Sequence, residues 1–342
     1  MNSSSIKYKM LNIMYILDDF TLESLALEDN INLIPAPQSP LLLWGKKIDL
    51  LLVESAWLGN HQKWRHKIAK YENHQDRNNS KLVQLIHWAK KKKIPTIFWN
   101  KEDPFHFDQF IDSAKLFDFV FTTDCNTIHK YKDHLGHTNI FTLGFSFQPK
   151  IHYPASFSEI EKKSSIFVGS YNEITHPDRK EWQKLCFSTA SQYGLTIVDR
   201  HAGRKEQFMK FPQYPNTTYL KNIPYNKTRQ YYSSYQQAIN VNTITDSPTM
   251  FSRRVLEIMA CQRLVISNPT LATDQLFPNL YEMIKSKEEA NELFLQLSFG
   301  LSNRQKEMAT QACNEVFRRY TIKQWIKDIL IQCNIDHPYL LT

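Results

Sequence analysis

The segment from Asp246 to Asn268, D-S-P-T-M-F-S-R-R-V-L-E-I-M-A-C-Q-R-L-V-I-S-N, predicts a loop, a helix, a short turn and a buried strand. Ser247, Thr249 and Ser252 are candidate N-caps for the helix, and residues 264–267 form an apolar run of strand length. A helix followed by a buried strand is the repeating unit of an α/β fold with a parallel sheet. The segment therefore points to the α/β class.

Two adjacent arginines, Arg253 and Arg254, fall in the first turn of this expected helix. Cations are disfavoured there because unpaired N–H groups and the helix dipole already make that end positive. A phosphate or diphosphate would offset the charge. Glu257 shares the helix face with both arginines and can offer a carboxylate to ribose or sugar hydroxyls. The alternative is that the arginines pair with Glu257 and other carboxylates and bind nothing.

Apolar runs alternate with helical segments along the whole chain of 342 residues, which is long enough for two domains. Such runs suggest strands that are buried on both faces of parallel sheets. Strands are expected at residues 11–17, 49–53, 95–99, 117–122 and 139–143, and again at 165–168, 195–198, 218–220, 238–242, 264–267 and 281–284. Helices are expected at 62–71, 81–92, 107–116, 127–134, 179–193 and 227–235, and over most of the chain after residue 287.

A stretch without clear periodicity, residues 149–163, separates the two halves and contains Pro149 and Pro154. We predict two doubly wound, Rossmann-like α/β domains that face each other across a cleft, with ligands at the carboxyl ends of the strands. The predicted boundaries are an N-terminal domain over residues 1–148, a linker over 149–163 and a C-terminal domain over 164–317.

The net charge of +8 suggests an anionic partner, and part of the excess lies in the run Lys90 to Lys93. An anionic substrate and an anionic membrane surface are both compatible with it, although lysines also suit the C-terminal end of a helix. No zinc-finger or RNA-recognition signature is present, so a nucleic-acid partner is not expected. The five cysteines form no C-x-x-C pair, and no signal peptide or membrane span is predicted, which favours the cytoplasm.

The eight glycines form neither G-x-G-x-x-G nor a P-loop, which excludes an ordinary dinucleotide-binding dehydrogenase and a P-loop kinase. The chain also contains no D-x-D pair and no H-E-x-x-H motif. We therefore expect no cofactor and no catalytic metal, and we expect phosphate groups to be handled by helix ends and arginines.

Polar residues collect after the expected strands of the first domain. Candidates for the acceptor side are Asp18, Asp19, Ser55, Trp57, Asn100 and Lys101. Glu102, Asp103 and His106 follow in the densest of these loops and are candidate acid/base groups. The alternative is that Asp103 caps the next helix while Glu102 pairs with Lys101.

In the second domain the first strand ends at Gly169, where a glycine lets backbone N–H groups approach an anion closely. Ser170 and Asn172 follow in the same loop, and Asp199 and Arg200 end the next strand. Tyr225 could flank a nucleobase, although an aromatic residue at such a place is more often part of the core.

Several of these motifs carry a family resemblance. They are I-L-D-D-F, D-L-L-L-V-E-S-A-W, P-T-I-F-W-N-K-E-D-P, F-D-F-V-F-T-T-D, I-F-V-G-S-Y, V-D-R and D-S-P-T-M-F-S-R-R-V-L-E-I-M-A-C, in order from about residue 10 to residue 270. The chain resembles the bacterial glycosyltransferases named after the spore-maturation protein of spore-crust glycosylation (the CgeB-like family), which belong to the two-domain GT-B class. The resemblance implies a C-terminal helix, within residues 318–342, that returns to the N-terminal domain.

The resemblance further implies a nucleotide-sugar donor, most often a UDP-sugar, bound mainly by the second domain, and an acceptor bound by the first. In the wider retaining GT-B clan, two glutamates eight positions apart often flank the donor. Glu257 matches the second of them, whereas Thr249 stands in the place of the first. An arginine often follows the glycine of the first strand in the second domain, and this chain has Ser170 there.

These observations predict glycosyl transfer without a metal ion. Arg253 and Arg254, with Ser252 and neighbouring N–H groups, would hold the diphosphate while Glu257 holds the ribose. Asp103 or Glu102 would act as base, or His106 if the reaction inverts; in a retaining reaction they would position a substrate. The acceptor would be a glycan, a lipid-linked glycan or a protein. The basic first domain would suit peripheral contact with the inner face of an anionic membrane, and a cytoplasmic acceptor explains the charge as well. Alternatives are a sugar-nucleotide epimerase or hydrolase of the same fold, an inactive nucleotide-sugar-binding module, and a basic nucleic-acid binder.

Overall fold

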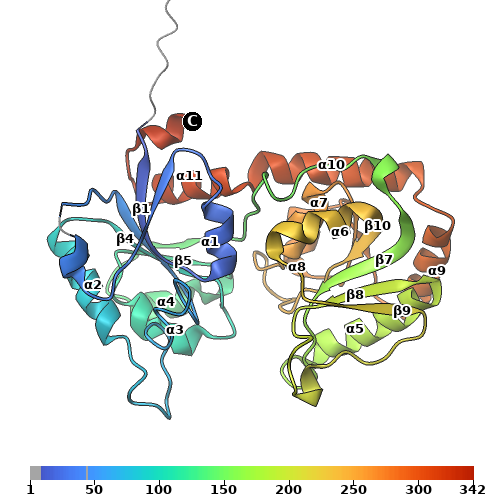
Figure 1. Cartoon of the computed structure of the whole chain (residues 1–342), viewed down its shortest axis with the longest axis horizontal. Helices are drawn as coiled ribbons and strands as arrows, with labels where there is room; N and C mark the ends of the chain where they lie inside the picture. The colour runs from blue at the N-terminus through green and yellow to red at the C-terminus, as the bar shows by residue number, and fades with distance from the viewer. Residues whose placement is uncertain (1–8, 44) are drawn as a thin grey trace, which may run out of the picture. The chain divides into compact units, whose positions relative to one another are not determined.

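A computed structural model describes residues 9–43 and 45–342, which divide into two compact units (Figure 1). Unit 1 comprises Met1–Phe145 and Ile322–Thr342, and unit 2 comprises Ser146–Thr321. Residues 1–8, on which the expected absence of a signal peptide partly rests, lie outside the described residues. Within the described ranges, no helix combines the length and the apolar character needed to cross a bilayer.

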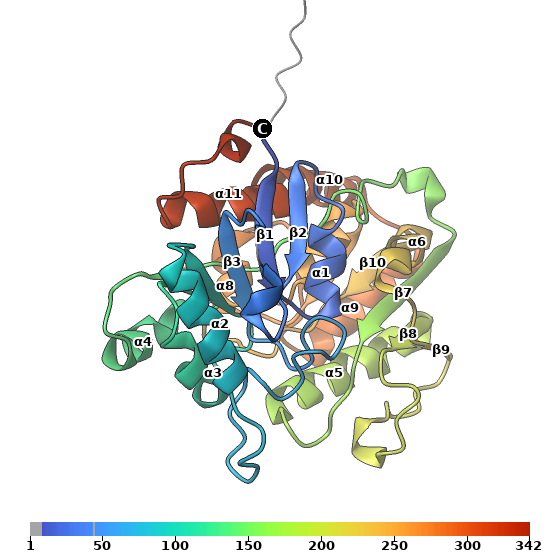
Figure 2. The same ribbon diagram turned by 60° about the vertical axis from the view of Figure 1, so that its left-hand side comes forward.

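Unit 1 is built on a parallel sheet of six strands in the order β2-β1-β3-β4-β5-β6, and Figure 2 shows β2, β1 and β3 side by side. The strands are β1 (Leu11–Ile16), β2 (Ile31–Pro35), β3 (Leu50–Glu54), β4 (Thr96–Asn100), β5 (Phe119–Thr122) and β6 (Ile140–Thr142). Its helices are α1 (Asp19–Leu25), α2 (Ser80–Lys91), α3 (Phe107–Ala114), α4 (Ile128–His134) and α11 (Ile322–Gln332), with short 3-10 turns at η1 (Pro40–Leu43), η2 (Cys125–Thr127) and η7 (Pro338–Leu341).

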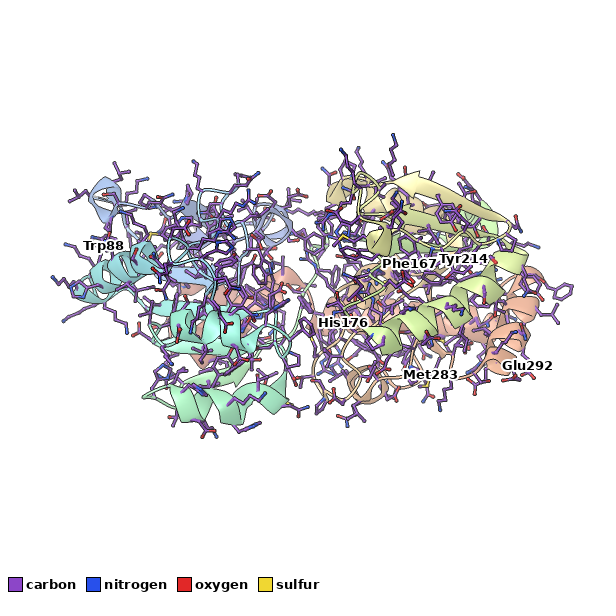
Figure 3. The ribbon with its side chains drawn as sticks, turned by 90° about the horizontal axis from the view of Figure 1, so that it is seen from below. Trp88, Phe167, His176, Tyr214, Met283 and Glu292 are labelled. Carbon is purple, nitrogen blue, oxygen red and sulfur yellow. The ribbon has the colours of Figure 1, made fainter. Side chains whose placement is uncertain are left out.

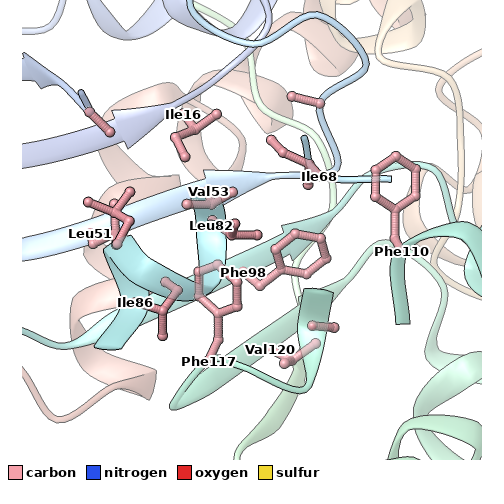
Figure 4. Close-up of a cluster of buried hydrophobic side chains, with 14 of the residues drawn as sticks. Ile16, Leu51, Val53, Ile68, Leu82, Ile86, Phe98, Phe110, Phe117 and Val120 are labelled. Atoms are coloured by element: carbon pink, nitrogen blue, oxygen red, sulfur yellow. The ribbon is translucent and has the colours of Figure 1, made fainter. Parts of the chain in front are cut away.

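Successive residues of a strand point to opposite sides of the sheet, and helices cover both sides, so both faces are buried. Leu51, Val53 and Phe98 face one side, where they pack against Leu82 and Ile86 of α2 (Figure 4). The opposite face packs against α1 and α11. Full burial of such a side chain contributes about 2 kcal/mol to the stability of the fold. Because every residue of these strands faces one buried side or the other, the strands are continuous apolar runs in the sequence.

The C-terminal helix α11 belongs to unit 1 although it follows unit 2 in the sequence. Trp325 anchors it: its indole N–H donates to the Gly144 carbonyl at 3.0 Å, and its ring meets that of Trp99 edge to face at 5.0 Å. Ile326 and Ile329 pack in the same buried cluster.

Unit 2 holds a second parallel sheet of six strands, in the order β12-β11-β10-β7-β8-β9. The strands are β7 (Lys162–Gly169), β8 (Leu195–Asp199), β9 (Thr217–Lys221), β10 (Tyr235–Ile239), β11 (Leu264–Ser267) and β12 (Glu282–Met283). Its helices are α5 (Pro177–Ala190), α6 (Thr228–Ser234), α7 (Arg254–Ala260), α8 (Leu271–Leu276), α9 (Lys287–Ser298) and α10 (Asn303–Arg319), with 3-10 turns at η3 (Phe157–Glu159), η4 (Ser191–Tyr193), η5 (Gln207–Met209) and η6 (Tyr225–Lys227). Helices α5 and α9 lie side by side on one face, with His176 at the start of α5 and Glu292 on α9 (Figure 3).

The strand order therefore confirms the predicted class of two doubly wound α/β domains. The structure differs from the sequence predictions at several places. Residues 62–71 form successive turns in place of a helix, and Gln62 and His66 have positive φ angles. The buried Trp64 explains this path, since its indole N–H donates to the Ala36 carbonyl at 3.0 Å. Strand β2 was not predicted, because Asn32 and Pro35 interrupt its apolar pattern.

The residues predicted as a linker, 149–163, belong to unit 2 and are fastened to it by Arg263. This arginine is fully buried, and its Nη1 donates to the Ala155 carbonyl at 2.8 Å. Its Nη2 donates to the carbonyls of Ser156 at 2.9 Å and Ser233 at 2.7 Å. A buried guanidinium whose donors all meet carbonyl oxygens fixes the segment that precedes β7.

Replacing Arg263 by alanine should lower the free energy of unfolding of unit 2 by about 3 kcal/mol, because several buried carbonyls would lose their donor. Urea denaturation measures this change. Arg304→Ala is the matched control, since the side chain of Arg304 is 73% exposed and lies 3.5 Å from Glu282. The control should change stability by less than about 0.5 kcal/mol. Equal effects of the two substitutions would show that Arg263 does not anchor the segment.

Candidate active site

The strand order of unit 2 reverses between β7 and β10, and their carboxyl ends form the switch point of this sheet. Ligands of open α/β sheets bind in the crevice outside such a point. Strand β7 ends there at Gly169, and β10 leads into Asn240 and Asn242. The side chains around these residues are therefore the first place to look for a site.

Arg254 bridges the two strands at the switch point. Its Nε donates to the Val168 carbonyl at 2.7 Å, its Nη1 lies 3.4 Å from Asn240 Oδ1, and its guanidinium stacks over the Phe167 ring at 4.7 Å. These partners are all uncharged. Burial lowers the pKa of Arg254, and the neighbouring charge of Arg200 lowers it further.

Gly169 is required by this arrangement. A Cβ atom at this position would lie 2.5 Å from the Phe167 ring and 2.8 Å from Arg254 Nη2, and both distances are shorter than real contacts. The glycine therefore gives Arg254 its place at the end of β7. In this way Arg254 supplies positive charge beside Ser170, where the family pattern often has an arginine.

Arg253 has a different environment and is only 8% exposed. Its Nη2 donates to the Tyr225 hydroxyl at 2.7 Å, and its Nε lies 3.3 Å from Glu257 Oε1. The alternative of a pairing with Glu257 thus holds for Arg253, but the two arginines do not act alike. Burial raises the pKa of Glu257, while Arg253 and the hydroxyl of Tyr225 oppose that rise.

Helix α7 begins later than predicted, at Arg254, and Arg253 is its N-cap residue. None of the three candidate serines and threonines caps it. Ser252 donates its N–H to Asn242 Oδ1 at 2.7 Å, and Ser247 Oγ accepts from the N–H of Met250 at 3.0 Å in the preceding turn. With seven residues the helix is short, so the arginine side chains provide most of the positive charge here.

Sequence reasoning missed Arg179, which lies in the first turn of α5. Its Nη2 donates to the Ser170 carbonyl at 2.9 Å. Burial lowers its pKa to about 10, with Arg254 and Arg200 as further causes. Its Nε is buried and meets no hydrogen-bond acceptor among the described residues. A cation in a first helical turn was the signal that singled out Arg253 and Arg254, and it was also present in P-D-R at the start of α5.

The other residues predicted for the donor lie in different surroundings. Arg200 is exposed after β8, and its N–H donates to the Gly169 carbonyl at 2.9 Å. Asp199 Oδ1 accepts from the N–H of His201 at 2.7 Å. Asn172 Oδ1 accepts from two backbone N–H groups of its own turn, at 2.9 and 3.1 Å. Tyr225 packs against the His152 ring at 5.3 Å.

Unit 1 has its own switch point between β1 and β3, and three charged residues meet there. Lys101 Nζ lies 2.8 Å from Glu54 Oε1 and 3.4 Å from Asp18 Oδ2. Asp18 also accepts from the backbone N–H groups of residues 57–59 at 3.2, 3.0 and 2.8 Å. Burial opposes the ionisation of Asp18, but Lys101 and these N–H donors outweigh it, so the pKa of Asp18 is lowered.

The remaining acceptor-side candidates mostly support this network. Ser55 Oγ accepts from the Lys101 N–H at 3.0 Å, and Asn100 Nδ2 donates to Asp103 Oδ1 at 2.8 Å. Asp19 is apart from it, exposed, with His61 Nδ1 at 2.7 Å.

Asp103 is enclosed on several sides. Its Oδ2 accepts from the hydroxyls of Thr122 at 2.6 Å and Tyr131 at 2.8 Å, in addition to the Asn100 bond. Burial raises its pKa to about 7. It does not cap α3, whose N-cap residue is His106. This enclosed carboxylate is better suited to holding the loop after β4 than to meeting a substrate.

Glu102 and His106 are more open to solvent than Asp103. Burial raises the pKa of Glu102, opposed by Lys101, His106 and a hydrogen bond from the Trp57 side chain. The ring of His106 meets that of Trp57 edge to face at 5.0 Å. Its Nδ1 has no hydrogen-bond partner among the residues that the structure describes. The structure thus brings Glu102, His106 and Trp57 together as one group.

The sequence predicts no catalytic metal anywhere in the chain, but the structure can be searched for a metal site only in the residues that it describes, which are all but nine. Within residues 9–43 and 45–342, no three His, Cys, Asp or Glu side chains gather so that they could hold a metal ion.

The pKa of Asp103 predicts a pH dependence of stability. The folded state binds this proton more tightly than the unfolded chain, in which the pKa is near 3.8. The carboxyl therefore stabilises the fold fully below that pH and loses the contribution as the pH rises through about 7. Asp103→Asn should remove this dependence, so wild type should lose stability relative to the variant between pH 4 and 7, as thermal unfolding would show.

Asp112→Asn is the control for this experiment, because the side chain of Asp112 is 47% exposed and lies on the surface of α3. It should leave the pH profile of wild type unchanged. Parallel profiles of wild type and Asp103→Asn would contradict the assignment of the raised pKa to Asp103.

Comparisons with known proteins bear on this geometry. A family described as "Glycosyl transferase-like" matches residues 181–331. The spore protein CgeB of Bacillus subtilis (strain 168) is 21% identical over 239 residues, which cover 66% of this chain and 71% of that protein. Both matches agree with the resemblance drawn from the motifs.

Solved structures agree on the fold. An α-glucosyltransferase in complex with UDP and a 13-mer DNA has a TM-score of 0.66 at 11% identity, covering 95% of this chain and 100% of that one. Alr3699/HepE of Anabaena, in complex with UDP and glucose, has a TM-score of 0.58 at 12% identity, covering 95% and 99%. A UDP-forming trehalose-phosphate synthase from Burkholderia xenovorans has a TM-score of 0.55 at 9% identity, covering 86% and 75%. The predicted GT-B fold is thereby confirmed.

Proposed function

We propose that this chain, a CgeB-like glycosyltransferase of the GT-B fold, moves a sugar from a UDP-sugar to a hydroxyl acceptor in the synthesis of a bacterial glycan, polysaccharide or glycoconjugate in the cytoplasm. Two of the similar structures are complexes with UDP-glucose. At 12% and 10% identity these structures are related to this chain by fold alone. The choice of UDP therefore rests on the similar fold together with the positive charge of the site.

The observation that carries the proposal is the positive charge at the switch point of unit 2. Arg254 and Arg179 are both held there by uncharged oxygen atoms, and both have a lowered pKa because burial and neighbouring arginines disfavour their charge. Glu257 lies nearby but pairs with Arg253. A diphosphate would offset the excess charge and accept hydrogen bonds from both guanidinium groups.

The same arginines would assist the chemical step. Breaking the bond between sugar and diphosphate places negative charge on the leaving group, and donors already fixed beside it stabilise that charge without reorganising. Arg254 is fixed by the Val168 carbonyl and Arg179 by the Ser170 carbonyl. In this proposal the group of Tyr225, Arg253 and Glu257 takes the nucleoside, with Glu257 at the ribose.

The acceptor side is assigned to unit 1. Glu102 is the preferred base for the acceptor hydroxyl, because its raised pKa brings it closer to neutral pH and it is more open than Asp103. His106 beside it is the alternative base in an inverting reaction. If the reaction retains configuration, both residues would position the acceptor.

Arg254→Ala and Arg179→Ala should each weaken the binding of UDP and of the UDP-sugar by about 10- to 100-fold, since each removes charged hydrogen bonds to phosphate. Isothermal titration calorimetry with UDP measures the change. Uridine, which has no phosphate, should bind wild type and both variants alike, and Arg304→Ala should leave UDP binding unchanged. Unaltered UDP affinity in Arg254→Ala would show that the phosphate lies elsewhere.

The reaction itself can be tested with a panel of nucleotide sugars, with and without glycan acceptors, while nucleotide release is followed. We expect release from a UDP-sugar only when an acceptor is present, and at the same rate with EDTA, because arginines take the role of a metal. A product formed from the donor alone would favour an epimerase or hydrolase. Binding without turnover would favour the inactive module, a reading that Thr249 supports because it replaces the family's first glutamate.

A further inference from the structure

Two adjacent leucines of unit 1 are exposed to solvent. Leu41 is 88% exposed and Leu42 is 70% exposed, both on the 3-10 turn η1. Among the described residues they are the one pair of large apolar side chains that are adjacent in sequence and both exposed to this degree. Single exposed leucines are common, but an exposed pair at the tip of a turn costs solubility and calls for a partner.

The turn is held firmly from below. Leu43 is 3% exposed and belongs to the core cluster that fills the space between the sheet and α2. Turn η1 lies beside α2, as the blue helical turn next to that helix in Figure 1. Val83 on α2 adds a further apolar side chain that is 42% exposed. The leucines are thus presented outward by an anchored turn.

Lysines follow this apolar tip closely in the chain, and the backbone N–H of Lys46 donates to the Leu43 carbonyl at 3.2 Å. Lys46 and Lys47 follow η1 directly and are exposed. Lys9 precedes β1, the strand next to β3, and its contact with Lys47 is the main cause that lowers the pKa of Lys47. The nearest carboxylate, Asp49, lies 4.0 Å from Lys47 and already accepts from Asn12 at 2.8 Å. This edge of unit 1 therefore carries more positive than negative charge.

The lysine run noted in the sequence extends the same edge. Residues 90–93 end α2 and precede β4, which pairs with β3. The amino ends of parallel strands share one edge of a sheet, so this run and Lys47 lie along the same edge. Lys90 is paired with Asp118 at 3.4 Å, and residues 91–93 are exposed.

We propose that this edge of unit 1 docks on an anionic lipid surface. Leu41 and Leu42 enter the boundary between headgroups and acyl chains, while Lys9, Lys46 and Lys47 contact lipid phosphates. An apolar tip followed closely by lysines has the composition that binds to such interfaces, where buried apolar area and electrostatic attraction add. The proposal stands apart from the donor site, which lies in unit 2.

Other partners fit less well. Two leucines and a valine cover far less than the roughly 800 Å² per partner that a stable protein interface buries. A nucleic acid would use the lysines but would gain little from exposed leucines, since its backbone offers charge and not an apolar medium.

Sedimentation with lipid vesicles tests the proposal. The full chain should sediment with vesicles that contain phosphatidylglycerol and stay in solution with vesicles of phosphatidylcholine alone. The double variant Leu41→Ser/Leu42→Ser should bind the anionic vesicles about tenfold more weakly or worse. Lys46→Gln/Lys47→Gln should weaken the preference for anionic lipid. Because all four side chains are exposed, the variants should keep the thermal unfolding midpoint of wild type.

The matched control is Phe299→Ser in unit 2, where a large apolar side chain is 79% exposed outside the proposed docking edge. It should bind vesicles like wild type. UDP affinity should be the same in every variant, which separates this proposal from the donor site. The proposal is overturned if wild type ignores anionic vesicles, if the leucine variant binds them as tightly as wild type, or if only duplex DNA is bound.

Discussion

The arrangement of unit 2 depends on one buried cation. The guanidinium of Arg254 joins β7 to β10 through the Val168 carbonyl and Asn240, at the point where the strand order reverses. Gly169 has no room for a side chain because the Phe167 ring and Arg254 fill the space beside it. A cation held among uncharged groups in a crevice is disfavoured by desolvation unless an anion arrives. In the proposed function the diphosphate would supply this anion, in addition to the nearby carboxylate of Glu257.

Most of the fold could be predicted from the sequence because both sheets are buried on both faces. Strands such as β3 and β11 are continuous apolar runs, and such runs leave little freedom in where the strand lies. The failures have local causes. Residues 62–71 have helix-like spacing, but tertiary contacts of the buried Trp64 decide their path. Strand β2 lies at an edge of its sheet, where Pro35 and polar residues are tolerated.

The candidate site was predictable only in part. Charge in a first helical turn identifies Arg253 and Arg254, yet the sequence could not show that one pairs with Glu257 while the other lies between two strands. Arg179 also lies in a first helical turn and was overlooked; that it lies near enough to Arg254 for the two charges to interact is visible only in the folded chain. For Asp103 the sequence pointed to a role that the structure makes less suitable. A carboxylate can act as a base, but Thr122 and Tyr131, which are distant in sequence, enclose this one.

Both units are parallel six-stranded sheets with one switch point each, but their strand orders differ and so does the charge at their switch points. In unit 1 a single cation, Lys101, lies between Glu54 and Asp18, and Asp18 also accepts from backbone N–H groups, so this crevice has no spare positive charge. In unit 2 Arg254 and Arg179 meet only uncharged oxygen atoms in their hydrogen bonds to Val168 and Ser170. Under the proposed function, a diphosphate would therefore bind at the second crevice and not at the first. The proposed assignment of donor and acceptor thus rests on the placement of charge on the two sheets, and the fold alone would not decide it.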